Sequence, residues 1–183
     1  MKFDRFKSEE ELLKSVLHSL AFDSYPKVSA IAGSKINPDI DILEISRSSA
    51  NQYRLIGYEL KLMKYDKRSK GLSWAALYKG AGHALLYLKN GVNQVALVLG
   101  FHENVPNDEI AEKFHEWLWN RRESLSRILG SYISVGIFLY KKGHFSPHIK
   151  ADSYFYPPDD KTRFLSQALL QRKFTYNKRL RLK

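Results

Sequence analysis

The stretch INPDIDILEIS, residues 36–46, has the composition of a buried strand but also contains two aspartates. Isoleucine favours β-strands, whereas Asp is among the residues that strands avoid. In a regular strand Asp39 and Asp41 would point to the same face, because side chains alternate with a period of two. An acid retained in such a strand needs a compensating interaction, so the stretch is a candidate functional site.

The next stretch, YRLIGYELKLMK at residues 53–64, shows strand alternation with one mostly apolar face. Its other face carries Glu59 and Lys61, which in a strand point the same way about 7 Å apart. If the two strands are neighbours, about 5 Å apart, these side chains would meet Asp39 and Asp41. Three carboxylates at one point repel one another unless a cation lies among them. The two stretches together predict a cation-binding site on a sheet.

The predicted ligands are carboxylate oxygens, which favour a hard cation, Mg²⁺ or Mn²⁺. Such an ion would hold a phosphate, lower the pKa of a bound water and neutralise charge on the leaving oxygen. Lys61 would orient the attacking water or contact the phosphate. We do not expect it to act as a free base, because the nearby acids favour its charged form.

The composition is that of one globular domain with a basic surface. The chain has 183 residues, of which 44% are hydrophobic and 27% charged, and single cores extend to about 250 residues. Lys and Arg number 30 against 19 Asp and Glu, which gives a net charge of +11. This excess favours a polyanionic partner such as nucleic acid, although solubility alone or a basic proteome would also explain it. The lack of cysteine excludes disulfides, thiolate zinc sites and Cys nucleophiles.

The N-terminal sequence MKFDRFKSEEELL is charged where a signal peptide carries its apolar region. No run approaches the roughly 18 apolar residues of a membrane helix. We therefore expect no membrane association and an intracellular, cytoplasmic location, in the host cell if the protein is viral.

Apolar periodicity and turn residues predict helices that alternate with strands. Ser8 and Glu11 have the spacing of a capping box, which would begin the first helix. The predicted elements are helix 8–22, strands 26–33, 39–46 and 53–64, helix 72–89, strand 92–101, helix 106–129, strand 132–140 and helix 161–173. This order predicts an α/β (α+β) three-layer fold with one mixed sheet flanked by helices. One domain, residues 1–172, would precede a basic tail, residues 173–183.

The sequence PD at residues 38–39, followed on the next strand by ELK at residues 59–61, resembles the PD-(D/E)xK nuclease superfamily. The acidic helix in front of these strands and the helix LYKGAGHALLYLKNG behind them strengthen the resemblance. The core shared by that superfamily is α, β, β, β, α, β, so the resemblance covers about residues 8–100. It implies a restriction-endonuclease-like core with an added C-terminal helix, strand and helix. It also implies a Mg²⁺-dependent endodeoxyribonuclease that hydrolyses phosphodiester bonds.

Within that superfamily, EEELLK at residues 9–14 and AGSK at residues 32–35 look most like the archaeal Holliday-junction resolvases. The resemblance implies a role in metal binding or catalysis for four residues, namely Glu9, Ser34 near the phosphate, Glu59 as a metal ligand and Lys61 as the catalytic lysine. Resolvases of this kind act on branched DNA as symmetric dimers. The resemblance therefore also implies a homodimer and a structure-specific activity.

The resemblance departs from the family pattern at INPDID, where two aspartates compete for one metal-binding role. The apolar pair that follows Asp41 favours that residue, whereas the proline before Asp39 favours the other. We expect Asp41 to be the principal ligand, with Asp39 as a neighbour or co-ligand. It remains open that Asp39 merely begins the strand, or that Glu59 and Lys61 form a solvated face.

Basic residues outside the acidic cluster are candidates for contact with DNA. Lys35 follows the predicted serine, and Lys79 and His83 lie on the helix near the site, where packing is the alternative to phosphate contact. Basic residues of the tail would contact phosphates and release counterions; these are Lys173, Lys178, Arg179 and Arg181. Trp117 and Trp119 are two residues apart and cannot share a helix face, so we expect core or dimer contacts there rather than base stacking.

Two other functions remain possible on this sequence. One is a nucleic-acid-binding protein that has the nuclease fold without turnover. The other is a restriction-type endonuclease, which would need a base-reading element in residues 101–183. Nothing in that region resembles a known reader, so we do not expect sequence specificity.

Overall fold

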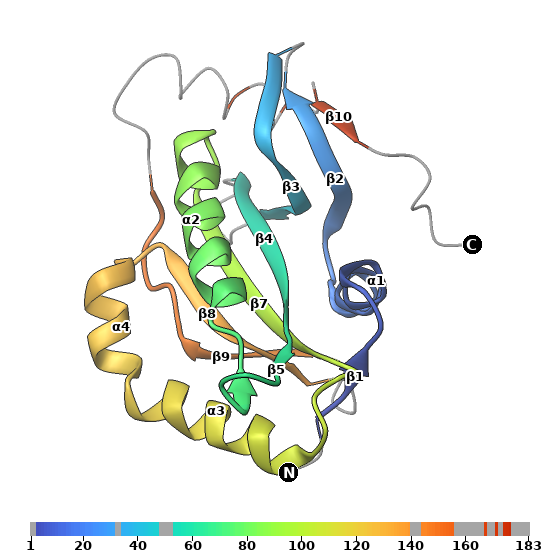
Figure 1. Cartoon of the computed structure of the whole chain (residues 1–183). Helices are drawn as coiled ribbons and strands as arrows, with labels where there is room; N and C mark the ends of the chain where they lie inside the picture. Colours follow the sequence, from blue (N-terminus) through green and yellow to red (C-terminus); the bar gives the residue numbers. More distant parts are fainter. Residues whose placement is uncertain are drawn as a thin grey trace.

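The computed structural model describes residues 3–31, 34–47, 53–139, 144–155, 167, 171 and 174–176. Within them, one mixed sheet has helices on both of its faces (Figure 1). The helices are α1 (Glu9–Ser19), α2 (Ala75–Lys89), α3 (Asp108–Asn120) and α4 (Arg122–Leu129). The strands of the sheet are β1 (Arg5–Phe6), β2 (Asp23–Ile31), β3 (Ser34–Arg47), β4 (Tyr53–Met63), β7 (Gln94–His102), β8 (Ile133–Leu139), β9 (His144–Ile149) and β10 (Phe174–Tyr176). A separate small hairpin consists of β5 (Tyr65–Asp66) and β6 (Gly71–Leu72).

The strands lie in the order β10-β2-β3-β4-β7-β8-β9, with β1 paired to β7. β2, β3 and β4 are antiparallel neighbours, whereas β4, β7 and β8 are parallel. Parallel strands need a crossover connection, which α2 provides between β4 and β7 and which α3 with α4 provides between β7 and β8. The predicted mixed sheet and the order α1-β2-β3-β4-α2-β7 are therefore confirmed.

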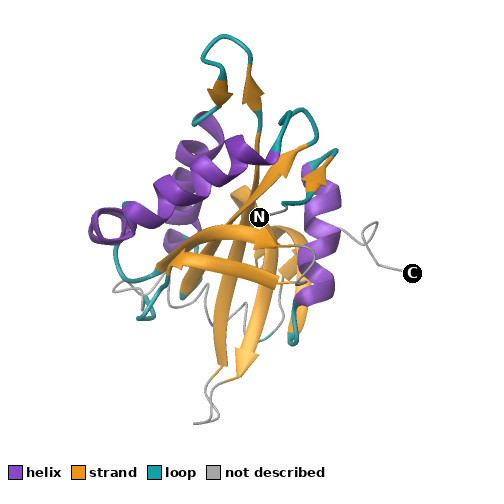
Figure 2. Ribbon diagram, turned by 90° about the horizontal axis from the view of Figure 1, so that it is seen from below, coloured by secondary structure: helices purple, strands orange, loops and turns teal. Residues whose placement is uncertain are grey.

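Helix α1 covers one face of the sheet, and the other three helices lie on the opposite face (Figure 2). The Ser8 hydroxyl accepts a hydrogen bond from the Glu11 N–H at 3.2 Å, which confirms the predicted N-terminal cap. Leu12, Leu13 and Val16 are completely buried against the sheet. No described helix has the length and apolar character needed to cross a membrane.

Helix α2 packs closely on β4 and β7 because it presents a glycine to them. A Cβ atom at Gly80 would lie 2.5 Å from Leu97 Cδ1 and 3.2 Å from Lys61 Cγ. The buried side of α2 includes Tyr87, whereas Leu85 is 55% exposed. The close approach at Gly80 brings the following turns of α2 over the polar face of β4.

Several predicted element boundaries are wrong. The helix expected over 106–129 is interrupted at Arg121, whose ψ of 7° is not helical, and so forms α3 and α4. The segment around β9, which gave no clear prediction, pairs antiparallel with β8. Residues 174–176, predicted as part of a basic tail, form β10 and pair with β2 at the edge of the sheet. The expected helix 161–173 lies almost wholly outside the described residues.

Candidate functional site

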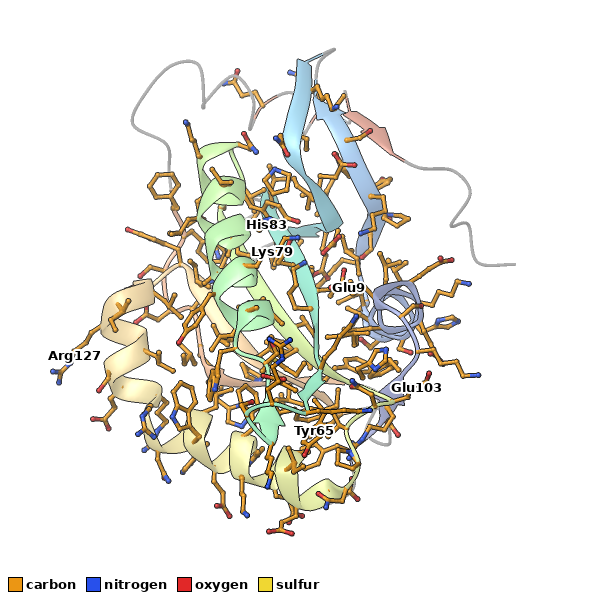
Figure 3. The ribbon with its side chains drawn as sticks, viewed as in Figure 1. Glu9, Tyr65, Lys79, His83, Glu103 and Arg127 are labelled. Atoms are coloured by element: carbon orange, nitrogen blue, oxygen red, sulfur yellow. The ribbon has the colours of Figure 1, made fainter. Side chains whose placement is uncertain are left out.

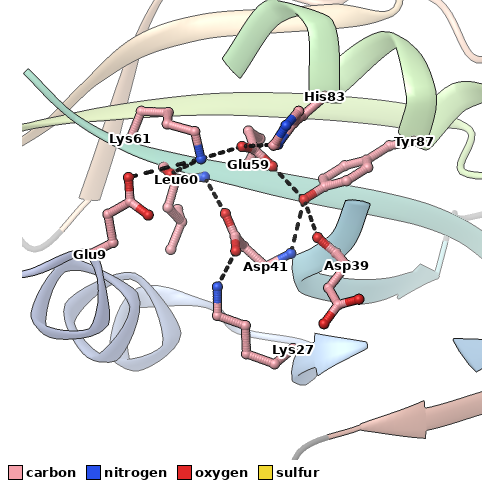
Figure 4. Close-up of polar contacts among 9 residues, drawn as sticks. All are labelled: Glu9, Lys27, Asp39, Asp41, Glu59, Leu60, Lys61, His83 and Tyr87. Atoms are coloured by element: carbon pink, nitrogen blue, oxygen red, sulfur yellow. Dashed lines mark hydrogen bonds and ion pairs between the residues drawn. The ribbon is translucent and has the colours of Figure 1, made fainter. Parts of the chain in front are cut away.

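The candidate site lies where β3 and β4 stop pairing with each other. Their last paired residues are Ile42 and Tyr58. Beyond this point the N–H of Leu60 donates to Asp41 Oδ2 at 2.9 Å. The Asp41 side chain thus takes the place of a strand backbone partner, and only 7% of the residue is exposed. This contact gives a physical reason for an aspartate among isoleucines (Figure 4).

The regular alternation of β3 is interrupted at the same place. Ile40 and Leu43 both belong to the core on the α2 side, although residues three apart in a regular strand face opposite ways. Asp39 is consequently exposed, and its carboxylate points away from that of Asp41 (Figure 4). The prediction that both aspartates share one face is wrong, and Asp39 contributes only its backbone carbonyl, which accepts from the Tyr87 hydroxyl at 2.7 Å.

Glu59 is the centre of the cluster and is 1% exposed. Its Oε1 forms an ion pair with Lys61 Nζ and lies 2.9 Å from His83 Nδ1, while its Oε2 contacts the Tyr87 hydroxyl. Burial raises the pKa of the Glu59 carboxyl, and so does the nearby Asp41 carboxylate, against the opposing effect of Lys61. The structure thus brings Asp41, Glu59 and Lys61 together, as the sequence predicts.

Lys61 is a buried ammonium surrounded by oxygen atoms. Besides Glu59, its Nζ lies 2.9 Å from the carbonyl oxygen of Leu60 and 3.9 Å from Glu9 Oε1. Burial alone would lower the pKa of Lys61, but the carboxylates of Glu59, Asp41 and Glu9 outweigh burial and raise it. The amine is therefore charged, in agreement with the expectation that it does not act as a free base.

Tyr87 links the two strands, and the sequence analysis missed it. Its hydroxyl accepts from the Asp41 N–H at 3.1 Å and lies within donating reach of both Glu59 and the Asp39 carbonyl. A phenol has one proton, so it can donate to only one of these two oxygens at a time. Burial raises the pKa of Tyr87, as do the carboxylates of Asp41 and Glu59, so the residue remains a phenol. Its position four residues after His83, on the same helix face, was the available signal.

Lys27 is the second residue that the sequence analysis missed. It lies in β2 with a φ of 50°, next to a shift of register between Val28 and Ala30. This backbone geometry turns the side chain to an ion pair with Asp41 Oδ1. Together with Lys61, it means that two lysines neutralise the two buried carboxylates.

A basic pocket of about 250 Å³ adjoins Lys61. Three lysines line it, Lys61, Lys64 and Lys79, together with Glu9 and Ser73. Its wall also includes the first turn of α2, which has no acidic residue and no side-chain cap. Uncapped N–H groups and lysines both favour an anion. Figure 3 shows which helices contribute side chains to this region: Glu9 comes from α1, and Lys79 and His83 come from α2.

Among the remaining predicted contacts with DNA, Lys35 alone has a side chain that the structure describes. Lys35 is exposed near the start of β3 and pairs in register with Ala30. Ser34 begins the same strand, and its side chain is outside the described part of the structure. The tail residues Lys173, Lys178, Arg179 and Arg181 also lie outside it.

The two carboxylates of the cluster are the groups available to a metal ion. Within the described ranges, no three acidic or histidine side chains are arranged to hold one ion. Asp41 and Glu59 nevertheless offer two buried carboxylates from adjacent strands, and Mg²⁺ commonly takes one or two carboxylates and keeps several waters. Each of their oxygens already has a protein partner, so a metal would share them with Lys27 and Lys61.

The chain matches no family model, no curated protein and no solved structure.

Proposed function

We propose that the protein is a Mg²⁺-dependent endonuclease that hydrolyses DNA phosphodiester bonds. The observation that carries this proposal is the burial of Glu59 and Lys61 on one face of β4, beside Asp41 of β3. Replacing a buried ion pair with well-packed apolar residues often costs a protein no stability. The presence of Glu59 and Lys61 in the interior therefore favours a functional role over a purely stabilising one. Two further features support the proposal, namely the element order expected of a restriction-endonuclease-like core and the net charge of +11.

In this proposal Asp41 and Glu59 hold the metal, and Glu9 lies near enough to Lys61 to contribute through a bound water. When bound, Mg²⁺ would polarise the phosphate and lower the pKa of a water molecule. Lys61 stays charged and contacts the anionic oxygen of the substrate or orients the attacking water. Tyr87 fixes the rotamer of Glu59 by hydrogen bonding, so the carboxylate is positioned before substrate arrives.

The basic pocket beside Lys61 would receive a phosphate of the DNA backbone. Lys64 and Lys79 supply charge there, and the first turn of α2 supplies N–H groups. A phosphate in this pocket would place the next one along the strand close to the carboxylates. Action on branched DNA and assembly as a homodimer are the finer parts of the proposal, and they depend on the resolvase-like sequences near the N-terminus.

The test is cleavage of supercoiled plasmid and of four-way junctions by the purified protein with Mg²⁺, Mn²⁺ or EDTA. We expect metal-dependent cleavage that Glu59→Ala and Lys61→Ala abolish. Matched controls are Glu123→Ala and Lys89→Ala, which remove an exposed acid of α4 and an exposed lysine at the C-terminal end of α2. Cleavage that survives both cluster substitutions would eliminate the assigned mechanism.

A second candidate function is binding of nucleic acid without turnover. The observation that favours it is the pairing of Asp41 and Glu59 with Lys27 and Lys61, because the cluster is neutralised without a metal ion. This function predicts DNA binding that is the same with Mg²⁺ and with EDTA. It also predicts no cleavage of any of the substrates above.

A further inference from the structure

A second pocket, which we call the aromatic pocket, lies between the β5–β6 hairpin and α3. Its volume is about 360 Å³, and its lining includes Trp74, Ile110, Phe114 and Trp117. The rings of Trp74 and Trp117 are 4.4 Å apart at an angle of 60°, and those of Phe114 and Trp117 are 6.2 Å apart and nearly parallel. The walls are therefore aromatic surfaces held in place by one another.

The rim of the aromatic pocket is basic. The hairpin carries Lys67, Arg68 and Lys70, all of them exposed, and Lys70 also lines the pocket. The one acid of the hairpin, Asp66, accepts hydrogen bonds from the Arg68 N–H at 2.9 Å and the Ser69 hydroxyl at 3.0 Å, so it is engaged within the turn. The combination of aromatic walls and a cationic rim complements a planar, apolar group that is attached to an anion.

The aromatic pocket and the basic pocket beside Lys61 share one wall. Leu72 and Trp74 line the aromatic pocket, whereas Ser73 and Ala75 line the basic one. Consecutive Cα atoms are about 3.8 Å apart. The short segment that leads from β6 into α2 thus separates the two pockets, and a ligand that crosses this segment can occupy both.

We propose that the aromatic pocket receives an unpaired nucleobase of the DNA strand whose phosphate binds beside Lys61. This inference rests on the proposed function and names what the site selects. Every base has a π-face that stacks on aromatic side chains with little dependence on its identity. A base can enter only when it is unpaired, so the pocket favours single-stranded or branched DNA over a regular duplex. Trp117 packs against the core, as the sequence predicts, and the proposal adds base stacking to this structural role.

The test compares two tryptophans of one helix. Trp117 lines the aromatic pocket, whereas Trp119 is 51% exposed and contacts His148 instead. Binding of a labelled single-stranded oligothymidylate is measured by fluorescence anisotropy in EDTA, so that no cleavage occurs. We expect Trp117→Leu to weaken binding about tenfold, in line with the stacking of one base on an aromatic side chain, and Trp119→Leu to leave binding within about twofold.

A second measurement does not depend on removing a packed tryptophan. The chain has 3 tryptophans, so in a Trp119→Phe background the two that remain both line the aromatic pocket. We expect oligothymidylate to quench their fluorescence, and an abasic oligonucleotide of the same length to bind about tenfold more weakly without quenching. Lys70→Gly should also weaken binding, and its φ of 51° suits glycine, so the fold is retained.

Three results would overturn the inference: equal affinity for abasic and thymidine strands, equal affinity of Trp117→Leu and Trp119→Leu, or quenching by an apolar peptide but not by DNA. These results are separable from failure of the proposed function. Cleavage without base-dependent quenching would contradict base binding in the aromatic pocket but not the proposed nuclease activity. Quenching without cleavage would support base binding in the aromatic pocket and contradict the proposed nuclease activity.

Discussion

Two buried glutamates on neighbouring strands each lie against a tyrosine hydroxyl, but their surroundings differ. Glu44 is 4% exposed and accepts from the Tyr58 hydroxyl at 2.5 Å on the α1 side of the sheet. Glu59 is 1% exposed on the α2 side, where it contacts the Tyr87 hydroxyl and also Lys61 and His83. Burial is the largest influence on the pKa of both carboxyls and raises it in each.

The difference shows that burial of an acid does not by itself indicate a functional site. A single neutral donor is enough for Glu44, because burial favours its protonated form. Glu59 has an ammonium beside it and a second carboxylate, Asp41, near enough to raise its pKa further. Because buried charges of both signs are costly to maintain for stability alone, we infer a functional role for Glu59 and a structural role for Glu44.

The largest effect is expected from Lys61→Met, which makes Glu59 resemble Glu44. The substitution leaves Glu59 without its ion-pair partner, and breaking a buried pair in this way destabilises a protein by about 3–5 kcal/mol. We expect a loss of this order in urea unfolding at neutral pH, together with loss of DNA cleavage. The control is Lys89→Met, which removes an exposed lysine at the end of α2. Equal stability of the two variants would mean that Lys61 and Glu59 are not coupled.

The effect on DNA cleavage can be compared directly when Glu59 and Glu44 are each changed to glutamine. Glu59→Gln keeps the shape and a hydrogen-bonding group but removes a metal-binding charge, so cleavage should fall by more than about 100-fold. Glu44→Gln should leave cleavage within about twofold, since this residue faces the other side of the sheet. The measurement is the initial rate of plasmid nicking at saturating Mg²⁺. Equal losses in both variants would point to a general effect on the fold.

A smaller effect is expected from pH on the stability contributed by Glu44. Burial raises the pKa of the Glu44 carboxyl above its ordinary 4.5, so the folded protein holds this proton more tightly than the unfolded chain. Below pH 4.5 the group is protonated in both states, and as pH rises through the folded pKa the folded state is destabilised by ionisation of a buried carboxyl. The stability of Glu44→Gln relative to the natural protein should therefore increase with rising pH.

Urea unfolding of both proteins from below pH 4.5 to neutral pH measures this difference. Subtraction of the two curves removes the contribution of all other acids that behave alike in both proteins. A difference that stays constant with pH would show that Glu44 has the same proton affinity in the folded and unfolded states.

Local pattern was sufficient to predict the strands β2, β3, β4, β7 and β8, and the pair Glu59 and Lys61 on β4. Glu59 and Lys61 were predicted because they interrupt the apolar alternation of β4 on a single face, and side-chain alternation in a strand is a local property. The order of helices and strands followed from periodicity in the same way. Both predictions depend on residues that are close together in the sequence.

The errors concern contacts between distant segments. Asp39 was placed beside Asp41 on the assumption of a regular strand, but the alternation of β3 breaks where it parts from β4. Lys27 reaches Asp41 only because β2 shifts register there, and Tyr87 reaches Glu59 only because α2 packs closely at Gly80. No pattern within β2 specifies its register shift, and the spacing of His83 and Tyr87 on α2 indicates a shared helix face but not how closely the helix packs.

The smallest effect is expected from Lys27→Gly, which removes the lysine that holds Asp41 Oδ1. Glycine suits the φ of 50° at this position, so we expect the fold to be retained. A unit charge about 4 Å from a divalent ion is worth about 2 kcal/mol in water, so removal of Lys27 should lower the half-saturating Mg²⁺ concentration by up to about thirtyfold. Lys70→Gly is a matched control, because Lys70 also has a left-handed backbone, with a φ of 51°, and lines the aromatic pocket instead.

Two measurements separate metal binding from turnover. The first is the Mg²⁺ dependence of cleavage at saturating DNA, and the second is Mn²⁺ binding followed by electron paramagnetic resonance without DNA. Tighter binding of Mn²⁺ to Lys27→Gly, but not to Lys70→Gly, would mean that Lys27 and the metal compete for Asp41. If neither variant changes Mn²⁺ binding, the ion does not use Asp41 Oδ1, and the cluster resembles the Glu44 site more closely than we infer.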